Sequence, residues 1–266
     1  GGTAGRRAED TAMGLQISSC GNGPDLALVH GWGLGAGVWS GVADALAAHC
    51  RVHLVSLPGY AGAADDGADF DTTADALAGA LPAGTTCCGW SLGGMLALAA
   101  CSRHPGHFGR LAMVGSTARF VQTGGWQAAQ PPELLDTFRR AIAGDTRATL
   151  SRFVMLFNQG DARGRVVTRT LTPLLDGALP QTTTLLRGLD WLAGVDLRER
   201  LPDLALKTML LHGDQDPLMP YAAAEAVAAT IPGARLERFS GCAHAPFISM
   251  PEPFVDTLRA FCHEPA

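Results

Sequence analysis

The sequence has 266 residues, of which 47% are hydrophobic and 17% charged, a composition that fits one globular α/β domain with an insertion. The formal net charge of −5 gives no basis for nucleic-acid binding, and no run of about 18 apolar residues could cross a membrane. Seven cysteines, an odd number without C-x-x-C spacing, indicate small buried side chains rather than disulfides or a zinc site, so we expect a reducing, cytoplasmic location.

The first part of the chain alternates between strand-like and helix-like stretches. Residues 1–12 lack the apolar segment of a secretory signal, so we expect a loose extension before Met13, a plausible start of the native chain. Residues 14–19 alternate weakly and predict an edge strand. Further strands are predicted at 26–30, 51–57 and 110–115, with helices at 38–49 and 72–81. This alternation predicts a mostly parallel sheet with helices on both faces.

A glycine-rich loop, His30-Gly31-Trp32-Gly33-Leu34-Gly35, follows the strand at 26–30. Such a loop can present a backbone N–H group to a ligand. A dinucleotide- or phosphate-binding loop is the alternative. It is the weaker interpretation, because the spacing is not G-x-G-x-x-G opening directly into a helix with an acid about 20 residues later.

The most informative stretch is Gly89-Trp90-Ser91-Leu92-Gly93-Gly94, which lies between a short β-type run and an Ala/Leu-rich helical run. G-x-S-x-G at a strand-to-helix turn lifts the serine hydroxyl clear of the sheet. Gly89 and Gly93 allow strand and helix to approach closely. The helix directs its N-terminal N–H groups and positive dipole end at any anion that forms near Ser91. A serine that only caps a buried helix explains the pentapeptide equally well.

The alternation of strands and helices stops between residues 118 and 200, where the sequence predicts only helices separated by turns. We expect this region to be a helical lid inserted over the carboxyl ends of the strands. The core is then formed by residues 13–117 and 201–266. The sheet is predicted to resume with a strand at 207–212, a helix at 221–230, a strand at 235–239 and a helix at 253–261.

Two loops after the resumed strands carry an acid and a histidine. The first contains Asp214 and Asp216, and the second contains His244. Active sites of parallel sheets lie at the strand carboxyl ends, and the chain order serine, acid, histidine is that of α/β-hydrolases. We prefer Asp216 as the acid because the G-x-x-D-x-x-x-P spacing places it on the loop. Asp214 is the alternative. If it is not the acid, it is expected to cap or form the turn in the same loop.

These residue types together support nucleophilic catalysis. A serine hydroxyl is a poor nucleophile near neutral pH, so His244 must accept its proton and a carboxylate must orient the imidazole. The alternative for His244 is a histidine with satisfied hydrogen bonds on the surface or in the core. The chemistry requires no metal or organic cofactor, and His212 beside Asp214 is better explained as a strand-end pair than as a metal site.

Four motifs, His30-Gly31, Gly89-x-Ser91-x-Gly93, Gly213-x-x-Asp216 and His244, resemble those of the α/β-hydrolase family, and the likeness spans about Leu15 to Phe261. More closely, the chain resembles the methyl ester esterases that act on pimeloyl-carrier esters in biotin synthesis. The stretches that carry this closer likeness are His30-Gly31-Trp32-Gly33-Leu34, Gly89-Trp90-Ser91-Leu92-Gly93-Gly94, Val195-Asp196-Leu197-Arg198 and Ala243-His244-Ala245-Pro246-Phe247-Ile248-Ser249.

The resemblance implies roles for particular residues. Ser91 is expected to be the nucleophile, Asp216 the acid and His244 the base. The backbone N–H groups of Trp32 and Leu92 are expected to form the oxyanion hole. The substrate is expected under the lid, near residues that match Phe153, Val154, Met155, Leu156 and Phe157.

The lid is basic. Between residues 139 and 169 lie seven arginines and two acids, a net charge of +5 against −10 for the rest of the chain. We expect this surface to dock an acidic acyl carrier protein, with Arg147, Arg152, Arg165 and Arg169 as the contacts. A solvated helical face is the alternative. Apolar side chains lie among these arginines, and we expect some of them to line a tunnel for a medium acyl chain, although core packing explains most of them.

We therefore predict a monomeric serine carboxylesterase that hydrolyses the methyl ester of pimeloyl-[acyl-carrier protein] through an acyl-enzyme. The alternative is a broader small-ester or C–C bond hydrolase of the same fold without a carrier partner. A non-catalytic binding protein of this fold is the third possibility. A fluorophosphonate probe separates it from the other two, because only a reactive serine would be labelled.

Overall fold

The structure, a computed structural model, describes residues 8–265 and contains one sheet of eight strands in the order β1-β2-β4-β3-β5-β6-β7-β8. The strands of this sheet are β1 (Ala8–Ala12), β2 (Leu15–Cys20), β3 (Asp25–Val29), β4 (Arg51–Ser56), β5 (Thr86–Trp90), β6 (Arg110–Val114), β7 (Lys207–Gly213) and β8 (Arg235–Phe239). From β4 onward along the sheet all neighbours are parallel, whereas β1 and β2 are antiparallel to their neighbours.

The central strands are buried because their apolar runs are covered on both faces. Every residue of β5 is buried, as are all but the first residues of β3, β6 and β7. Parallel strands that are covered on both faces read as continuous apolar runs, which is the pattern that predicted them. The sheet predicted from the sequence is therefore confirmed, with strand ends that differ by one or two residues.

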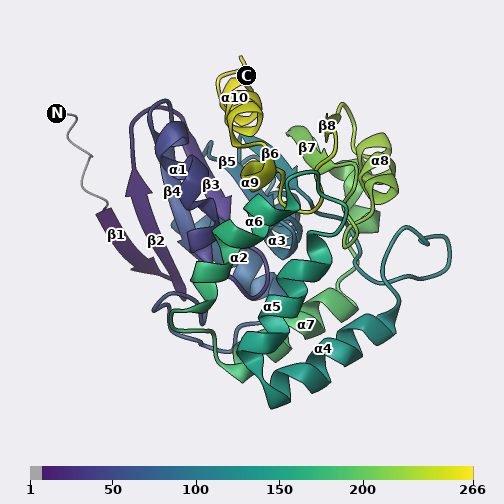
Figure 1. Ribbon diagram of the computed structural model, residues 1–266. Coiled ribbons are helices and arrows are strands. Elements are labelled where there is room, and N and C mark those ends of the chain that lie inside the picture. The colour runs from purple at the N-terminus through teal and green to yellow at the C-terminus, as the bar shows by residue number, and fades with distance from the viewer. Residues whose placement is uncertain (1–7, 266) are drawn as a thin grey trace.

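Helices cover both faces of the sheet (Figure 1). The helices outside the lid are α1 (Ser40–Ala47), α2 (Phe70–Ala80), α3 (Leu92–Arg103), α8 (Tyr221–Thr230), α9 (Pro246–Ser249) and α10 (Pro251–Cys262), with the 3-10 helix η1 (Ala36–Trp39) before α1. On one face α1 packs against α9 and α10, and on the other α2 packs against α3. The short α9 directly follows His244 and was not predicted.

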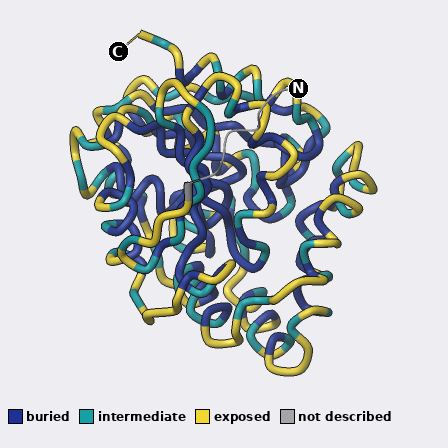
Figure 2. Tube along the Cα trace, turned by 90° about the vertical axis from the view of Figure 1, so that its left-hand side faces the viewer, coloured by how far each residue is buried: buried dark blue, intermediate teal, exposed yellow. Residues whose placement is uncertain are grey.

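The secondary-structure elements between β6 and β7 are all helices. They are α4 (Pro132–Gly144), α5 (Thr146–Phe157), α6 (Gly164–Leu171), η2 (Thr172–Leu175), α7 (Thr182–Gly194) and η3 (Arg198–Asp203). Asp145 caps α5 by accepting a hydrogen bond from the N–H group of Ala148 at 2.9 Å. Figure 1 shows these helices as a layer beside the sheet, with α4 packed against α5 and α7. In Figure 2 buried residues run through the sheet, while the outer turns of the lid are exposed.

The amino-terminal prediction is wrong for part of its range. Residues 8–12 form β1, which pairs with β2, so β2 is not the edge of the sheet. Met13 and Gly14 make the turn between them with φ values of 54° and 79°, typical of a tight hairpin turn. An edge strand that is mostly exposed needs no apolar alternation, so residues 8–12 carry no pattern from which a strand could be predicted. Residues 1–7 lie outside the described residues.

No helix in the described part of the chain combines the length and apolar character that crossing a bilayer requires.

Candidate active site

Ser91 occupies a strained turn between β5 and α3. Its backbone has φ 56° and ψ −122°, in the left-handed region that non-glycine residues avoid. Hydrogen bonds on both sides hold this conformation. The Ser91 N–H group donates to the carbonyl of Val114 at 2.9 Å, and its carbonyl accepts from the hydroxyl of Ser116 at 2.7 Å. The serine is therefore fixed at the carboxyl end of a central strand.

The glycines on either side of Ser91 are required by close backbone contacts. A Cβ atom on Gly89 would lie 2.1 Å from the carbonyl oxygen of Gly93. A Cβ atom on Gly93 would lie 2.3 Å from the carbonyl oxygen of His30. Both neighbours are backbone atoms that cannot rotate away. The G-x-S-x-G spacing is therefore a steric requirement of this turn, and it brings α3 against the glycine-rich loop after β3.

His244 and Asp216 form a buried pair. The Nδ1–H group of His244 donates to Oδ2 of Asp216 at 2.8 Å, and both side chains are fully buried. The other carboxylate oxygen accepts the N–H groups of Leu218 and Met219 at 2.9 Å each, which fixes its orientation. The Nε2 atom of His244 is buried and has no hydrogen-bond partner among residues 8–265. The ring thus faces the carboxylate with one nitrogen and leaves the other free to accept a proton.

The loop that carries His244 lies beside the serine turn. Trp90, the residue before Ser91, donates from its indole Nε1–H to the carbonyl of His244 at 2.9 Å. The two rings are 5.2 Å apart between centroids. Residues that are more than 150 positions apart in the chain are therefore in direct contact at the site.

Asp214, the alternative acid, is engaged elsewhere. It forms an ion pair with Arg238 at 2.7 Å and accepts the N–H group of Gly241 at 2.8 Å. His212 does not pair with Asp214 either. Its Nε2–H group donates to the carbonyl of Met219 at 2.7 Å, and burial lowers its pKa, so it stays neutral. His212 also lies 3.5 Å from Asp216, and thus supports the loop of the acid, a role that the sequence did not predict.

A neutral histidine holds the glycine-rich loop after β3. Burial lowers the pKa of His30 to about 4, so its Nδ1–H group donates to the carbonyl of Gly31 at 2.7 Å while its Nε2 atom accepts from the N–H of Leu57 at 3.1 Å. The hydroxyl of Tyr60 accepts the N–H group of Gly33 at 3.0 Å. Trp32 lies between these two anchored residues. Tyr60 was missed because a single tyrosine in a turn has no distinctive sequence pattern.

The two expected oxyanion donors have backbone N–H groups without helix or strand partners. Leu92 is the first residue of α3, where an N–H group has no carbonyl four residues earlier in the helix. No hydrogen bond from the backbone N–H of Trp32 is present in the described part of the chain. Its side chain is bound instead, since the indole Nε1–H donates to the carbonyl of Leu185 in α7 at 2.8 Å.

Helix α5 covers the site with part of the predicted substrate-binding stretch. The Phe153 ring packs edge-on against Trp32 at 5.0 Å, and the Phe157 ring lies 5.1 Å from that of His244. Val154 is also buried and Leu156 is half-buried. Met155 is different. It is 61% exposed and lines an open hollow between α5 and α6, so its prediction as a residue facing the site is wrong.

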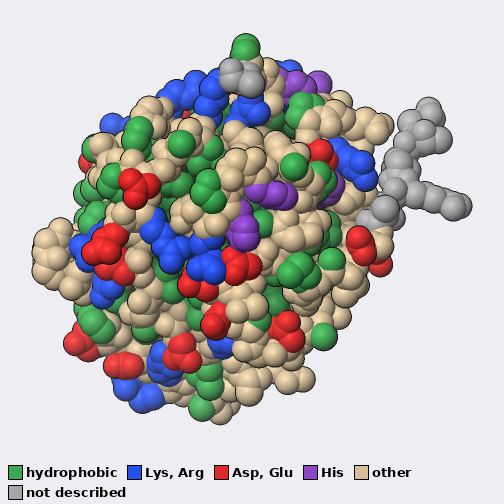
Figure 3. All heavy atoms as spheres, turned by 180° about the vertical axis from the view of Figure 1, so that it is seen from behind, with side chains coloured by type: hydrophobic (Ala, Val, Ile, Leu, Met, Phe, Trp, Pro, Cys, Tyr) green, Lys and Arg blue, Asp and Glu red, His purple; other side chains and the backbone are tan. Residues whose placement is uncertain are grey.

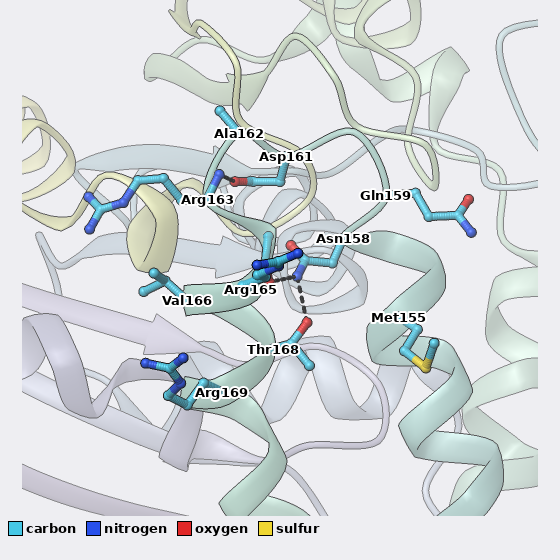
Figure 4. Close-up of a pocket in the computed structure, with 11 residues that line it drawn as sticks. Met155, Asn158, Gln159, Asp161, Ala162, Arg163, Arg165, Val166, Thr168 and Arg169 are labelled. Carbon is cyan, nitrogen blue, oxygen red and sulfur yellow. Dashed lines mark hydrogen bonds between the residues drawn. The ribbon is translucent and has the colours of Figure 1, made fainter.

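The four arginines expected to contact a partner differ in their surroundings. Arg147 pairs with Asp176 at 2.6 Å and donates to the carbonyl of Leu175 at 2.7 Å. Arg152, Arg165 and Arg169 are exposed, and no ion pair of theirs occurs within residues 8–265. Arg165 and Arg169 lie around the hollow between α5 and α6 (Figure 4). On the back of the molecule, by contrast, basic and acidic side chains are intermixed (Figure 3).

A metal site requires several ligand side chains close together. Among residues 8–265, no group of three or more His, Cys, Asp or Glu side chains is arranged to hold a metal ion.

Comparisons with known proteins identify the family of the chain. Residues 26–251 match the family model of the alpha/beta hydrolase fold. A pimeloyl-[acyl-carrier protein] methyl ester esterase from Aromatoleum aromaticum is 42% identical over 237 residues, which cover 87% of this chain and 95% of that protein. The protein of the same name from Nitrosomonas europaea is 37% identical over 248 residues, or 92% and 98% of the two chains.

Among solved structures, an esterase from Exiguobacterium antarcticum superimposes with a TM-score of 0.87 at 22% identity, over 97% of this chain and 99% of that one. A bromoperoxidase from Bacillus anthracis gives the same TM-score at 19% identity, over 97% and 100% of the two chains. At these identities the two structures support the fold alone. Together with the family model and the curated relatives, they show that the chain belongs to the α/β-hydrolase family.

Proposed function

We propose that the protein is a serine carboxylesterase in which Ser91 is the nucleophile, His244 the base and Asp216 the orienting acid. One observation carries the proposal. His244 donates from Nδ1 to Asp216 at 2.8 Å and has no partner for Nε2 among residues 8–265, while its carbonyl accepts from the indole of Trp90, the residue before Ser91, at 2.9 Å. A base that is oriented by a carboxylate and has a free nitrogen is what activation of a hydroxyl requires.

The reaction proceeds through an acyl-enzyme. The Ser91 oxygen attacks the ester carbonyl while Nε2 of His244 takes the hydroxyl proton. The N–H groups of Trp32 and Leu92 stabilise the tetrahedral oxyanion, and each such donor contributes about 3 kcal/mol to lowering the barrier. The alcohol leaves with the proton from His244, and water then repeats the cycle to release the acid.

The substrate that we propose is the methyl ester of a pimeloyl group on an acyl carrier protein. Two relatives, 42% and 37% identical over most of their lengths, carry the name of that activity. The buried apolar side chains of α5, Phe153, Val154 and Phe157, offer packing for an acyl chain next to the serine.

The carrier protein docks, in this proposal, on the lid arginines that have no ion-pair partner in the described part of the chain. Arg152, Arg165 and Arg169 are exposed on α5 and α6, so an acidic partner can approach them without breaking an existing ion pair. Arg147 contributes less, because Asp176 already neutralises it. The cytoplasmic location and the monomeric state stay predictions.

The test compares two substrates in one triple variant, Arg152→Glu/Arg165→Glu/Arg169→Glu. We expect kcat/KM for the carrier-linked ester to fall at least about 10-fold at low salt, because charge steering is reversed. Dimethyl pimelate, which has no carrier, should be hydrolysed as by the wild type. Each arginine is also reversed alone. The control for these single variants is Arg51→Glu, which makes the same charge change outside the lid, at the exposed start of β4. An unchanged kcat/KM for the carrier-linked ester would favour a broader small-ester hydrolase without this partner.

A further inference from the structure

The turn between α5 and α6 touches the loop that carries His244, and Asp161 is at the centre of the contact. One oxygen of its carboxylate, Oδ2, accepts the N–H group of Ala243, the residue before His244, at 2.7 Å. The other oxygen, Oδ1, accepts the hydroxyl of Ser249 at 2.8 Å and the N–H group of Arg163 at 2.7 Å. A single carboxylate of the lid therefore binds the loop of the base on both sides of the histidine.

Three further hydrogen bonds reinforce this contact. The Ala162 N–H group donates to the carbonyl of Gly241 at 2.8 Å, and the Arg163 guanidinium donates to the carbonyl of Ser249 at 3.1 Å. The N–H group of His244 itself donates to the carbonyl of Phe157, the last residue of α5, at 3.3 Å. Lid residues thus bind the loop at its beginning, in its middle and at its end.

The core binds the start of the same loop as well: the Asp214 carboxylate accepts the N–H group of Gly241 at 2.8 Å, and the N–H group of Gln215 donates to the carbonyl of Cys242 at 2.9 Å. Its contacts with His244 are the Asp216 carboxylate on the ring and the Trp90 indole on the carbonyl. The backbone immediately before the histidine is held from the lid side, by Asp161 and Phe157. Because the imidazole extends from this backbone, its distance to the Ser91 oxygen depends on where the lid places the loop.

We propose that Asp161 is a positioning residue for His244, acting through the Ala243 N–H group and the Ser249 hydroxyl. This inference rests on the proposed role of His244 as the base. Asp161 lies outside the Ser-Asp-His pattern and does not contact the imidazole. Its role is to make the lid a structural support of the base as well as a cover for the substrate.

The test uses four variants and a small activated ester, p-nitrophenyl acetate, which needs no carrier docking. Asp161→Ala removes both acceptors, whereas Asp161→Asn keeps one acceptor for Ala243 and can donate to Ser249, losing only the acceptor of the Arg163 N–H group. Asp145→Ala is the matched control, because it removes another hydrogen-bonded carboxylate from the same lid, at the far end of α5 from the loop. His244→Ala reports on the base itself. Thermal unfolding of each variant sets an assay temperature at which all are folded.

We expect Asp161→Ala to lower kcat by about 10- to 100-fold, because a displacement of a catalytic group by about 1 Å has effects of that size, with KM little changed. Asp161→Asn should recover most of the loss, and Asp145→Ala should keep the wild-type kcat.

Two results would overturn the positioning role: a kcat of Asp161→Ala equal to that of Asp145→Ala, or a loss that appears in KM alone. If His244→Ala keeps wild-type activity, the proposed base is wrong as well, so the two failures are distinguishable. If Asp161→Ala does not fold, Ser249→Ala takes its place. That variant removes one of the bonds to Asp161 and should lower kcat to a value between those of wild type and His244→Ala, and an unchanged kcat would count against the proposal.

Discussion

The α/β core and the lid place their functional side chains in different ways. In the core, Ser91, Asp216 and His244 each follow a parallel strand, and backbone geometry fixes them through the turn at Ser91 and the amides around Asp216. The lid has no strand to place its residues. It is joined to the core by separate side-chain and backbone contacts, so its position depends on groups that lie far apart in the chain.

Three such contacts hold the lid at different points. The Trp32 indole binds the carbonyl of Leu185 in α7 at 2.8 Å. Asp65, in the loop after β4, pairs with Arg187 of α7 at 2.5 Å. Asp161 binds the loop of His244. These hydrogen bonds join the lid to the core at points far apart in the chain, in addition to the apolar side chains that the lid buries in the common hydrophobic core.

The largest contrast between the two regions is expected for alanine in place of glycine. In the core, Gly93→Ala puts a Cβ atom 2.3 Å from the backbone of His30 and should cost more than about 4 kcal/mol of unfolding free energy, or prevent folding. In the lid, Gly144→Ala at the end of α4 meets no atom of the described residues within 4 Å and should be neutral or stabilise by up to about 1 kcal/mol. Urea titration of both variants measures the difference, and equal losses would contradict it.

Acid should destabilise the core before it affects the lid. The pKa of His30 is about 4 in the folded core against 6.5 in the unfolded chain, so the unfolded state binds a proton first as the pH falls. The contribution of neutral His30 to the free energy of unfolding is complete above pH 6.5. It is lost as the pH falls to about 4, a decrease of about 3 kcal/mol. The pKa of His212 is also lowered by burial, which acts in the same direction, and residues 118–200 contain no histidine.

Urea unfolding at pH 7 and at pH 4.5 measures this loss. His30→Gln, which can keep a donor for Gly31 and an acceptor for Leu57 without titrating, is the control and should lose less stability over the same interval. A wild-type stability that does not fall between these pH values would show that the core histidines are not kept neutral by burial.

The smallest effect is expected for one fastening of the lid. Trp32→Phe removes the hydrogen bond to Leu185 and should lower the free energy of unfolding by about 1 kcal/mol. Hydrogen exchange should increase in α7 and remain unchanged in α3, because the contact joins the lid to the loop and does not support the sheet. An equal increase in both helices would mean that lid and core open together.

The same contrast explains how much of the molecule could be predicted from its sequence. Buried strands such as β5 and the turn at Ser91 have local signatures, because apolar runs and small residues are required within a few positions. The edge strand β1 has none, since its exposed side chains bury no apolar face. The buried face of α5 could have been predicted from helical periodicity. Leu150, Phe153, Val154 and Phe157 repeat at the spacing of a buried stripe, which places Met155 on the opposite side.

Polar contacts between distant segments could not be predicted. Asp161 lies 82 positions from Ala243, and Trp32 lies 153 positions from Leu185. A single aspartate in a turn, or a carbonyl in a helix, has no pattern that identifies such a partner. These contacts depend on how the lid packs on the core, which no local stretch of sequence determines.

The most direct test of the central claim is the covalent labelling of Ser91. The folded wild-type protein is treated with a fluorophosphonate, and the adduct is located by peptide mass spectrometry. We predict one adduct, on the peptide of residues 89–94 at Ser91, forming much more slowly in His244→Ala because the hydroxyl then lacks its base. No adduct on the folded wild-type protein, or an adduct at another residue, would contradict the assignment of Ser91 as a nucleophile activated by His244.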